Sequence, residues 1–393
     1  MLDVWGTFNR VNLDPIMQTL SPADKDFWKH IVAAGNQLGL QLLPSFMGPG
    51  SAGNVVFSPT SVFVLLCLVY NGACGNTYIE LATALGLPAD KDLNPWMRQL
   101  INYINSHDPQ TLDVQMASAL FFASGEHLHF DFANTLTESY SASLYSIDFF
   151  EPDAVDRVNA WVSNATKKKI ERIAPEFDPS MRFVLLNAIY FLGRWADPFS
   201  PSQTTMRDFY VMEGGVKKVA MMSHQGPSYY YEDNDCQSVL LPYQGGNYAM
   251  QIVLPKTMQS PIALLPRIQE IAARAANSVK SDVALALPKF EFDFHLQLQN
   301  TLAGLGISDL SDPVRCDLGR IGHNIVVSRI IHQAVIKVDE QGTEAAAVTA
   351  AMGLGLPQAA SQSIEMTVDH PFLFSICDTV TGQILFLGTI FVP

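Results

Sequence analysis

Hydrophobic residues recur with a helical period in the first part of the chain. Apolar positions three or four residues apart predict a helix that begins after the N-cap Ser21 and runs through Leu43. A Ser-Pro pair opens a second predicted helix over residues 60–70, which is apolar on almost every side and should lie at the centre of the fold. A third helix, amphipathic with lysines on its polar side, is predicted over residues 156–173.

Strand patterns come mostly later in the chain. A continuous apolar run at 183–191 predicts a buried strand. Four further strand patterns follow at 220–231, 248–254, 283–287 and 325–338. Because helices come first and most strands later, the order favours an α+β fold over a parallel sheet with regular crossovers. Length alone favours two or three domains, but no linker or change of composition interrupts residues 21–393, so a single domain there, preceded by an N-terminal extension, 1–20, of unknown role, is allowed.

Residues 341–363 follow neither period. This segment is rich in Ala, Gly, Thr and Ser, and it carries no charge after Glu344. Its larger apolar side chains are few: Met352, Leu354 and Leu356. About 20 residues without an anchor inside a compact domain are uncommon and are usually functional or disordered. The segment is therefore a candidate for function.

Composition and charge bear on the partners. With 24 Lys and Arg against 38 Asp and Glu, the 393 residues carry a net charge of −14, which argues against a nucleic acid as the main partner. The apolar runs are shorter than the roughly 18 residues of a membrane-spanning helix, so no membrane partner is expected. The first residues lack the pattern of a secretory signal, which leaves the localisation open between the cytoplasm and, if a signal was removed, the outside of the cell.

The sequence contains none of the strong enzyme signatures. The nucleophile elbow, the phosphate-binding loop and the zinc helix are all absent. His127 and His129 have the spacing to share a metal on one strand face, but no third ligand follows them, so surface histidines are the favoured interpretation. His332 lies within an apolar strand pattern and is either a hydrogen-bonded core residue, which is favoured, or a catalytic base. We expect no enzyme, no metal and no cofactor.

Several segments together resemble the serpin family of serine protease inhibitors, over about residues 21–393. The most specific is the block 186–191, followed by Gly193, Trp195 and Pro198-Phe199. Other matching blocks are 54–61, 72–77, 158–170, 253–255, 287–290, 369–374 and 386–389.

The resemblance implies both a fold and a mechanism. The fold would have a large central mixed β-sheet, additional sheets, about nine helices and an exposed reactive-centre loop at about 341–363. The protein would be a suicide-substrate inhibitor of serine endopeptidases, with cysteine endopeptidases as a further target class. It would trap the acyl-enzyme by inserting its cleaved loop into the central sheet. The alternative is a non-inhibitory serpin-fold protein that binds a ligand or chaperones a client.

The family's hinge pattern, E-x-G-T-E-A-A-A, is reproduced at the start of the loop. The matching positions are Glu340, Gly342, Thr343, Glu344, Ala345, Ala346 and Ala347, with Thr349 just beyond. In strand geometry alternate residues share a face, and the face from Thr343 to Ala351 is entirely small and uncharged. Such a face can enter a packed sheet because it adds little volume. A short helix capped by Thr343 fits the pattern equally well, and the resemblance favours the strand.

The resemblance also assigns two regions that would control opening of the sheet. The shutter positions are Ser58, Ser61, Asn187 and His332, whose types suit a buried hydrogen-bond cluster. The breach positions, where the loop would first enter, are Trp195, Lys289 and Glu340. A carboxylate and an ammonium there could join the ends of two strands.

The bond that a protease would cut has two main candidate positions, and Met352 and Leu354 offer further ones. The family's spacing from Glu340 places Leu356 before the bond and Pro357 after it, although most serine proteases do not cut before proline. Counting back from Pro371 gives Gln358 and Ala359 instead. The apolar Leu356 favours a chymotrypsin-, elastase- or subtilisin-like target. Few Lys or Arg occur in residues 88–107, so no heparin site is evident, and we expect a monomer.

Overall fold

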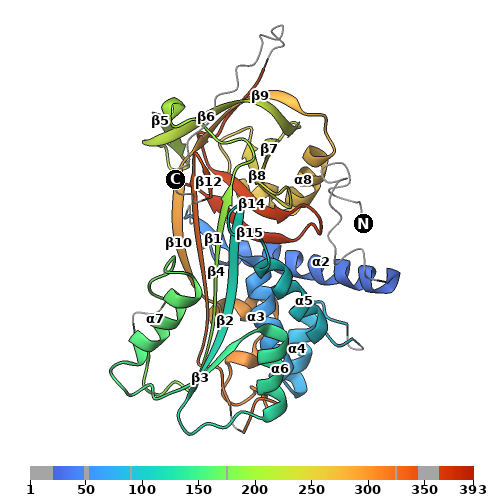
Figure 1. Cartoon of the computed structure of the whole chain (residues 1–393), viewed down its shortest axis with the longest axis vertical. Coiled ribbons are helices and arrows are strands. Elements are labelled where there is room, and N and C mark those ends of the chain that lie inside the picture. The colour runs from blue at the N-terminus through green and yellow to red at the C-terminus, as the bar shows by residue number, and fades with distance from the viewer. Residues whose placement is uncertain (1–20, 48–52, 89–90, 174–175, 324, 344–362) are drawn as a thin grey trace.

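Two β-sheets organise the chain and determine where each helix lies (Figure 1). The structure is a computed structural model that describes residues 21–47, 53–88, 91–173, 176–323, 325–343 and 363–393. Residues 344–362, which join the two sheets in sequence, lie outside the described residues, and so does the extension 1–20.

The first sheet is the large central mixed sheet that the resemblance implies. Its six strands lie in the order β10 (Phe290–Gln297), β11 (Arg329–Asp339), β12 (Gly342–Thr343), β4 (Phe183–Arg194), β2 (Leu112–Ala123) and β3 (Ser143–Ile147). Strands β4 and β11 also pair with each other in parallel, whereas β10 and β12 run antiparallel to β11. The short β12 therefore lies between two long strands that are direct neighbours along most of their length.

The second sheet has nine strands and receives the chain after residue 362. Its order is β1 (Val55–Phe57), β15 (Ile384–Ile390), β14 (Phe372–Asp378), β8 (Tyr248–Pro255), β7 (Cys236–Pro242), β6 (Gly215–Glu232), β9 (Ser281–Pro288) and β13 (Ile364–Thr367), with β5 (Thr205–Val211) beside β6. Strand β13 is an edge strand of this sheet. One end of the segment 344–362 is thus fixed by β12 in the central sheet and the other by β13 in the second sheet.

Helices cover both sides of the central sheet (Figure 1). On one side lie α3 (Pro59–Gly72), α4 (Gly75–Ala84), α5 (Asn94–Asn105) and α6 (Phe130–Tyr140), and on the other lies α7 (Ala154–Ala165). The remaining helices are α2 (Pro22–Ser45), α8 (Ile268–Ala276) and the four-residue α9 (Gln299–Leu302). The described residues thus contain eight α-helices, where about nine were expected, and the α+β class is confirmed. No helix in this part of the chain is both long and apolar enough to cross a membrane.

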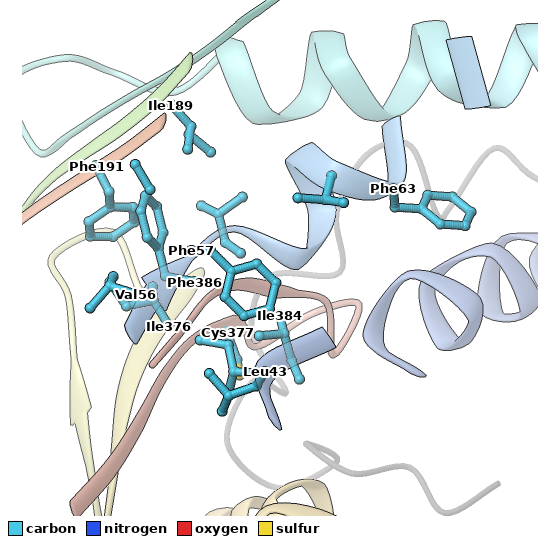
Figure 2. Close-up of a cluster of buried hydrophobic side chains, with 14 of the residues drawn as sticks. Leu43, Val56, Phe57, Phe63, Ile189, Phe191, Ile376, Cys377, Ile384 and Phe386 are labelled. Carbon is cyan, nitrogen blue, oxygen red and sulfur yellow. The ribbon is translucent and has the colours of Figure 1, made fainter. Parts of the chain in front are cut away.

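The core lies between the two sheets and around α3, which is buried along nearly its whole length. Phe57, Phe63, Ile189, Phe191 and Phe386 come from four different elements and meet in one cluster (Figure 2). The odd-numbered side chains of β4 supply Ile189 and Phe191 to this cluster, because alternate residues of a strand point to opposite faces. The prediction of a central apolar helix is therefore confirmed.

Three sequence predictions differ from the structure. Helix α7 ends at Ala165 instead of residue 173, because Lys167 and Lys168 adopt left-handed backbone angles that stop it. Strand β11 begins at Arg329, four residues later than predicted. Several strands, among them β2 and β3 of the central sheet, were not predicted.

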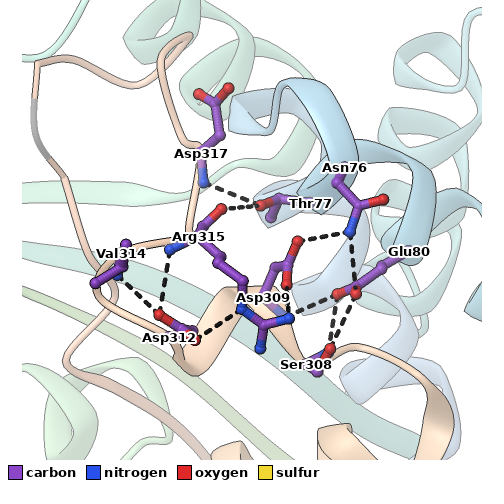
Figure 3. A network of polar contacts seen from close by, with 9 residues as sticks. All are labelled: Asn76, Thr77, Glu80, Ser308, Asp309, Asp312, Val314, Arg315 and Asp317. Atoms are coloured by element: carbon purple, nitrogen blue, oxygen red, sulfur yellow. Dashed lines mark hydrogen bonds and ion pairs between the residues drawn. The ribbon is translucent and has the colours of Figure 1, made fainter.

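A polar network holds the segment before β11 against α4 (Figure 3). The Glu80 carboxylate on α4 accepts hydrogen bonds from the backbone N–H groups of Ser308 and Asp309, each at 2.8 Å. Arg315 forms an ion pair with the buried Asp309 at 2.9 Å. These contacts anchor the chain segment that precedes β11 to α4.

Candidate functional site

The central sheet is open at one end, and the start of the hinge fills the opening. Strands β4 and β11 pair directly from Val184 and Arg329 as far as Tyr190 and Val335. Beyond that pair the two strands separate, and Thr343 lies opposite both Gly193 of β4 and Val338 of β11.

Gly342 occupies a position that a larger residue cannot share. Its φ is +153°, and a Cβ atom there would lie 2.0 Å from the carbonyl oxygen of Gly193. Since a non-bonded carbon and oxygen need more than 3 Å, any side chain at this position would push β12 away from β4. The glycine therefore allows the hinge backbone to lie between the two strands.

Thr343 faces the core and is fully buried. Its Oγ1 is 2.7 Å from the hydroxyl of Tyr243, whose ring stacks on Trp195 with 4.6 Å between the centroids. Trp195 in turn donates from Nε1 to the carbonyl oxygen of Asp339 at the end of β11. Thr343 thus occupies a buried pocket beside Tyr243. It lies on the face that the sequence predicted to point inward.

The predicted pair of Lys289 and Glu340 is formed. Lys289 Nζ lies 2.7 Å from Glu340 Oε2, and Thr204 donates to Oε1 at 2.7 Å. Burial alone would raise the pKa of Glu340, but the hydrogen bonds from Lys289 and Thr204 outweigh it and hold the pKa below its usual range. The backbone of Glu340 also accepts from Phe199 N at 2.9 Å. Glu340 therefore ties the end of β11 to the residues around it through side chain and backbone.

His332 forms hydrogen bonds with two of the other three shutter residues, Ser58 and Asn187. Its Nε2 accepts a hydrogen bond from the backbone N–H of Ser58 at 3.0 Å, so its Nδ1 carries the proton and donates to Asn187 Oδ1 at 3.1 Å. Asn187 donates onward to Ser118 Oγ at 3.1 Å. Burial, with a smaller contribution from His295, lowers the pKa of His332 to about 3. The ring is thus a neutral, hydrogen-bonded core residue, the favoured one of the two sequence interpretations.

Ser61 and Ser118 differ from the sequence prediction. Ser61 is buried and its N–H donates to Ser58 Oγ at 3.1 Å, but within the described residues its own hydroxyl has no hydrogen-bond partner. The predicted cluster of four is therefore not fully satisfied. Ser118 takes part without having been predicted, and the alternating pattern of β2 was the signal that could have revealed it.

The rest of the predicted loop lies outside the described residues. This applies to the remaining hinge positions and to both candidate bonds, namely Glu344, Ala345, Ala346, Ala347, Thr349, Leu356, Pro357, Gln358 and Ala359. The described ends of this segment are Thr343 and Ser363.

The other candidate residues form no catalytic or metal site where the structure describes them. His129 is the N-cap residue that precedes α6, and its ring packs against His323 at 5.6 Å between centroids. In the described ranges, no three His, Cys, Asp or Glu side chains gather in a metal-binding arrangement. All five cysteines are free thiols.

Comparisons with known proteins give consistent matches. A family model described as "Serpin (serine protease inhibitor)" matches residues 33–393. Iripin-3 of Ixodes ricinus is 35% identical over 377 residues, which cover 92% of this chain and 94% of that protein. Leukocyte elastase inhibitor of Xenopus laevis is 33% identical over 352 residues, covering 86% and 93%. The solved structure of native protease nexin-1 with heparin has a TM-score of 0.83 at 28% identity and covers 93% of this chain and 100% of that one.

Proposed function

The chain belongs to the serpin family of serine protease inhibitors, and we propose that it traps an endopeptidase by inserting its cleaved reactive loop between β4 and β11. The observation that carries this proposal is the position of Gly342 and Thr343, which already pair with both strands. The protein acts as a substrate that captures the protease and has no catalytic step of its own.

The register of β12 gives the register of the strand that would follow it. Continuing the antiparallel pairing from Thr343 and Gly193 brings Ala345 opposite Phe191 and Ala347 opposite Ile189. Both β4 residues are large and point into the core. Two alanines fit beside them because they add little volume to a close-packed interior.

The same register, continued along either β4 or β11, brings Thr349 opposite a shutter residue. Continued along β4 it reaches Asn187, and continued along β11 it reaches His332, which are direct partners in the uncleaved sheet. Insertion would separate these two side chains and break the 3.1 Å hydrogen bond between them. The Thr349 hydroxyl can donate and accept, so it can replace the lost partner of each. The presence of a polar residue at position 349, on the small and uncharged inward face of the hinge, is thereby explained.

Insertion also explains how the protease would be inactivated. About 14 residues at roughly 3.3 Å each would carry the attached enzyme some 45 Å, across the whole sheet. An active site tolerates a misplacement of only about 1 Å without a large loss of rate. Pulling on the acyl group would therefore stop deacylation and leave a stable covalent complex.

The target is expected to be a chymotrypsin-, elastase- or subtilisin-like protease. Leu356 before the cleaved bond supports an apolar specificity pocket, with cleavage after Gln358 as the alternative. One relative is named for inhibition of leukocyte elastase, which agrees with an uncharged residue at this position.

Covalent trapping and its dependence on the core face are directly testable. The chain is incubated with a panel of chymotrypsin-, elastase-, trypsin- and subtilisin-like proteases and run on denaturing gels, with mass analysis of the released C-terminal fragment. We expect a stable complex with at least one protease. Thr343→Arg should turn the chain into a substrate that is cleaved without complex, because the arginine would place a charge in the pocket of Tyr243.

Glu344→Arg is the matched control, since the next residue points to the opposite face of the strand. This variant should trap as well as the unchanged chain. Cleavage without complex by every protease, or equal trapping by Thr343→Arg, would contradict the proposal. In the first case the binding or chaperone role would take its place.

A further inference from the structure

Three side chains meet on the α7 face of the sheet at the last closed pair of β4 and β11. We call Asp113, Lys167 and Tyr190 the Asp113 cluster. Tyr190 of β4 lies opposite Val335 of β11, and the next positions along β4 lead to the opening filled by β12. Tyr190 is therefore at the pair that must separate first when the inserted strand advances.

The contacts within the Asp113 cluster are short and charged. Lys167 Nζ lies 2.8 and 2.7 Å from the two carboxylate oxygens of Asp113 on β2. The Tyr190 hydroxyl donates to Asp113 Oδ1 at 3.1 Å, and Lys167 Nζ is 5.9 Å from the centre of the Tyr190 ring. The Asp113 side chain is 13% exposed and that of Lys167 is 52% exposed, so solvent screens this ion pair in part. Burial and the Asp113 charge raise the pKa of Tyr190, which keeps its hydroxyl protonated as a donor.

The backbone around Lys167 is held in an unfavourable conformation. Lys167 and Lys168 have φ of +50° and +63°, a region that non-glycine residues rarely occupy. Two such residues in succession end α7 and direct Lys167 back to the sheet. Local strain of this kind persists only where surrounding contacts support it, and the ion pair with Asp113 is such a contact.

The chain segment after α7 lies over the boundary between β4 and β11, where the sheet would open. Ile170 packs in one cluster with Ala188 of β4 and Ile331 of β11. An inserting strand must pass between β4 and β11 beneath this cover. Continued pairing would bring Ala346 opposite Tyr190, on the same face as the cluster.

We propose that Lys167, Asp113 and Tyr190 are positioning residues that slow loop insertion by holding the chain after α7 down on the sheet. This inference rests on the proposed function and adds which residues set the rate of insertion. The Lys167 contact fixes the cover to β2 and β4 beside the first pair that must open. Without it, the cover can lift more readily and the inserted strand can advance sooner.

The rate can be measured without any protease. A synthetic acetylated peptide with the sequence of residues 343–354 is incubated with the uncleaved full chain, and its incorporation is followed by native gel and intact mass. Lys167→Met should take up the peptide about two to five times faster than the unchanged chain, the change expected for losing one partly screened ion pair. Lys168→Met is the matched control for charge, and Lys167→Arg, which keeps the ion pair, should restore the slow rate.

Two further measurements separate a change of insertion rate from a change of folding. Asp113→Asn should accelerate uptake to a similar degree, and the double variant with Lys167→Met should be no faster than either single variant, because both remove the same contact. High salt should accelerate the unchanged chain but not Lys167→Met.

Equal or slower uptake by Lys167→Met, or equal acceleration by Lys168→Met, would overturn the role of the Asp113 cluster while leaving protease trapping intact. Uptake by none of the chains, together with no trapping on gels, would overturn the proposed function and this inference with it.

Discussion

At the scale of single residues, the site depends on buried polar groups whose hydrogen bonds fix their protonation state. His332 accepts from Ser58 and donates to Asn187, so its protonation state is fixed by its neighbours. Protonation of Nε2 would place two N–H groups, that of His332 and that of Ser58, against each other in a buried space. The shutter is therefore the part of the molecule where acid should act first.

This arrangement predicts a loss of stability in mild acid. The folded pKa of His332, about 3, lies below the usual value of about 6.5. The unfolded chain therefore binds the proton more readily, and stability falls as the pH drops below 6.5 toward 3. Between pH 7 and 5.5 the loss should be about 1 kcal/mol.

The urea midpoint of unfolding at the two pH values measures this loss. His332→Gln offers an amide oxygen to Ser58 and no titrating group, so its midpoint should change less. An identical pH dependence in both chains would contradict the assignment to His332.

At the scale of elements, the end of β11 and the start of β12 are held as a unit by Glu340. Its carboxylate has two partners, Lys289 and Thr204, and its carbonyl has a third, Phe199 N. The turn between the strands is short, with Glu340 and Gln341 as its two residues outside either strand. Releasing Glu340 would thus free both the strand end and the hinge.

Glu340→Lys should promote exchange of loops between molecules. The new ammonium would face Lys289 in a site where the unchanged carboxylate is mostly buried, which costs about 1 to 3 kcal/mol at the opening of the sheet. We expect dimers and larger oligomers by size-exclusion chromatography after prolonged warming. Glu291→Lys, which makes the same charge change at an exposed position of β10, should remain monomeric. Unchanged monomer of both variants would contradict this role of Glu340.

Buried helices and strands were easier to predict from the sequence than the point at which α7 ends on the face of the sheet. The continuous apolar pattern of β4 and the Ser-Pro cap of α3 each depend on neighbours in sequence, and both were predicted. The end of α7 was not, because the lysines after Ala165 continue the amphipathic pattern while their left-handed angles depend on contacts with β2.

The same distinction holds within the site. The resemblance predicted that Lys289 would lie near Glu340 and that His332 would lie near Asn187, because these residues belong to recognisable sequence blocks. It did not indicate Thr204, Ser118 or the Tyr243 pocket of Thr343, because those partners are set by the register of distant strands. Contacts across the sheet require the register, which no local pattern contains.

At the scale of the whole molecule, the proposed mechanism adds a strand to the central sheet after cleavage. Residues 344–362 join β12 to β13, and β12 extends for just two residues into an opening between strands that are otherwise paired. A state held in this way is maintained by a barrier to insertion instead of by equilibrium. Cutting the loop removes the connection to β13 and allows the strand to be completed.

The measurement that tests this account most directly is the heat stability of the chain before and after cleavage within residues 344–362. Burial of about ten inserted residues at roughly 1 kcal/mol each would raise the melting temperature by on the order of 10 °C. We predict such a rise for the cleaved chain, with both fragments remaining associated, and no rise for cleaved Thr343→Arg. A cleaved chain that melts at or below the temperature of the uncleaved one would contradict strand insertion.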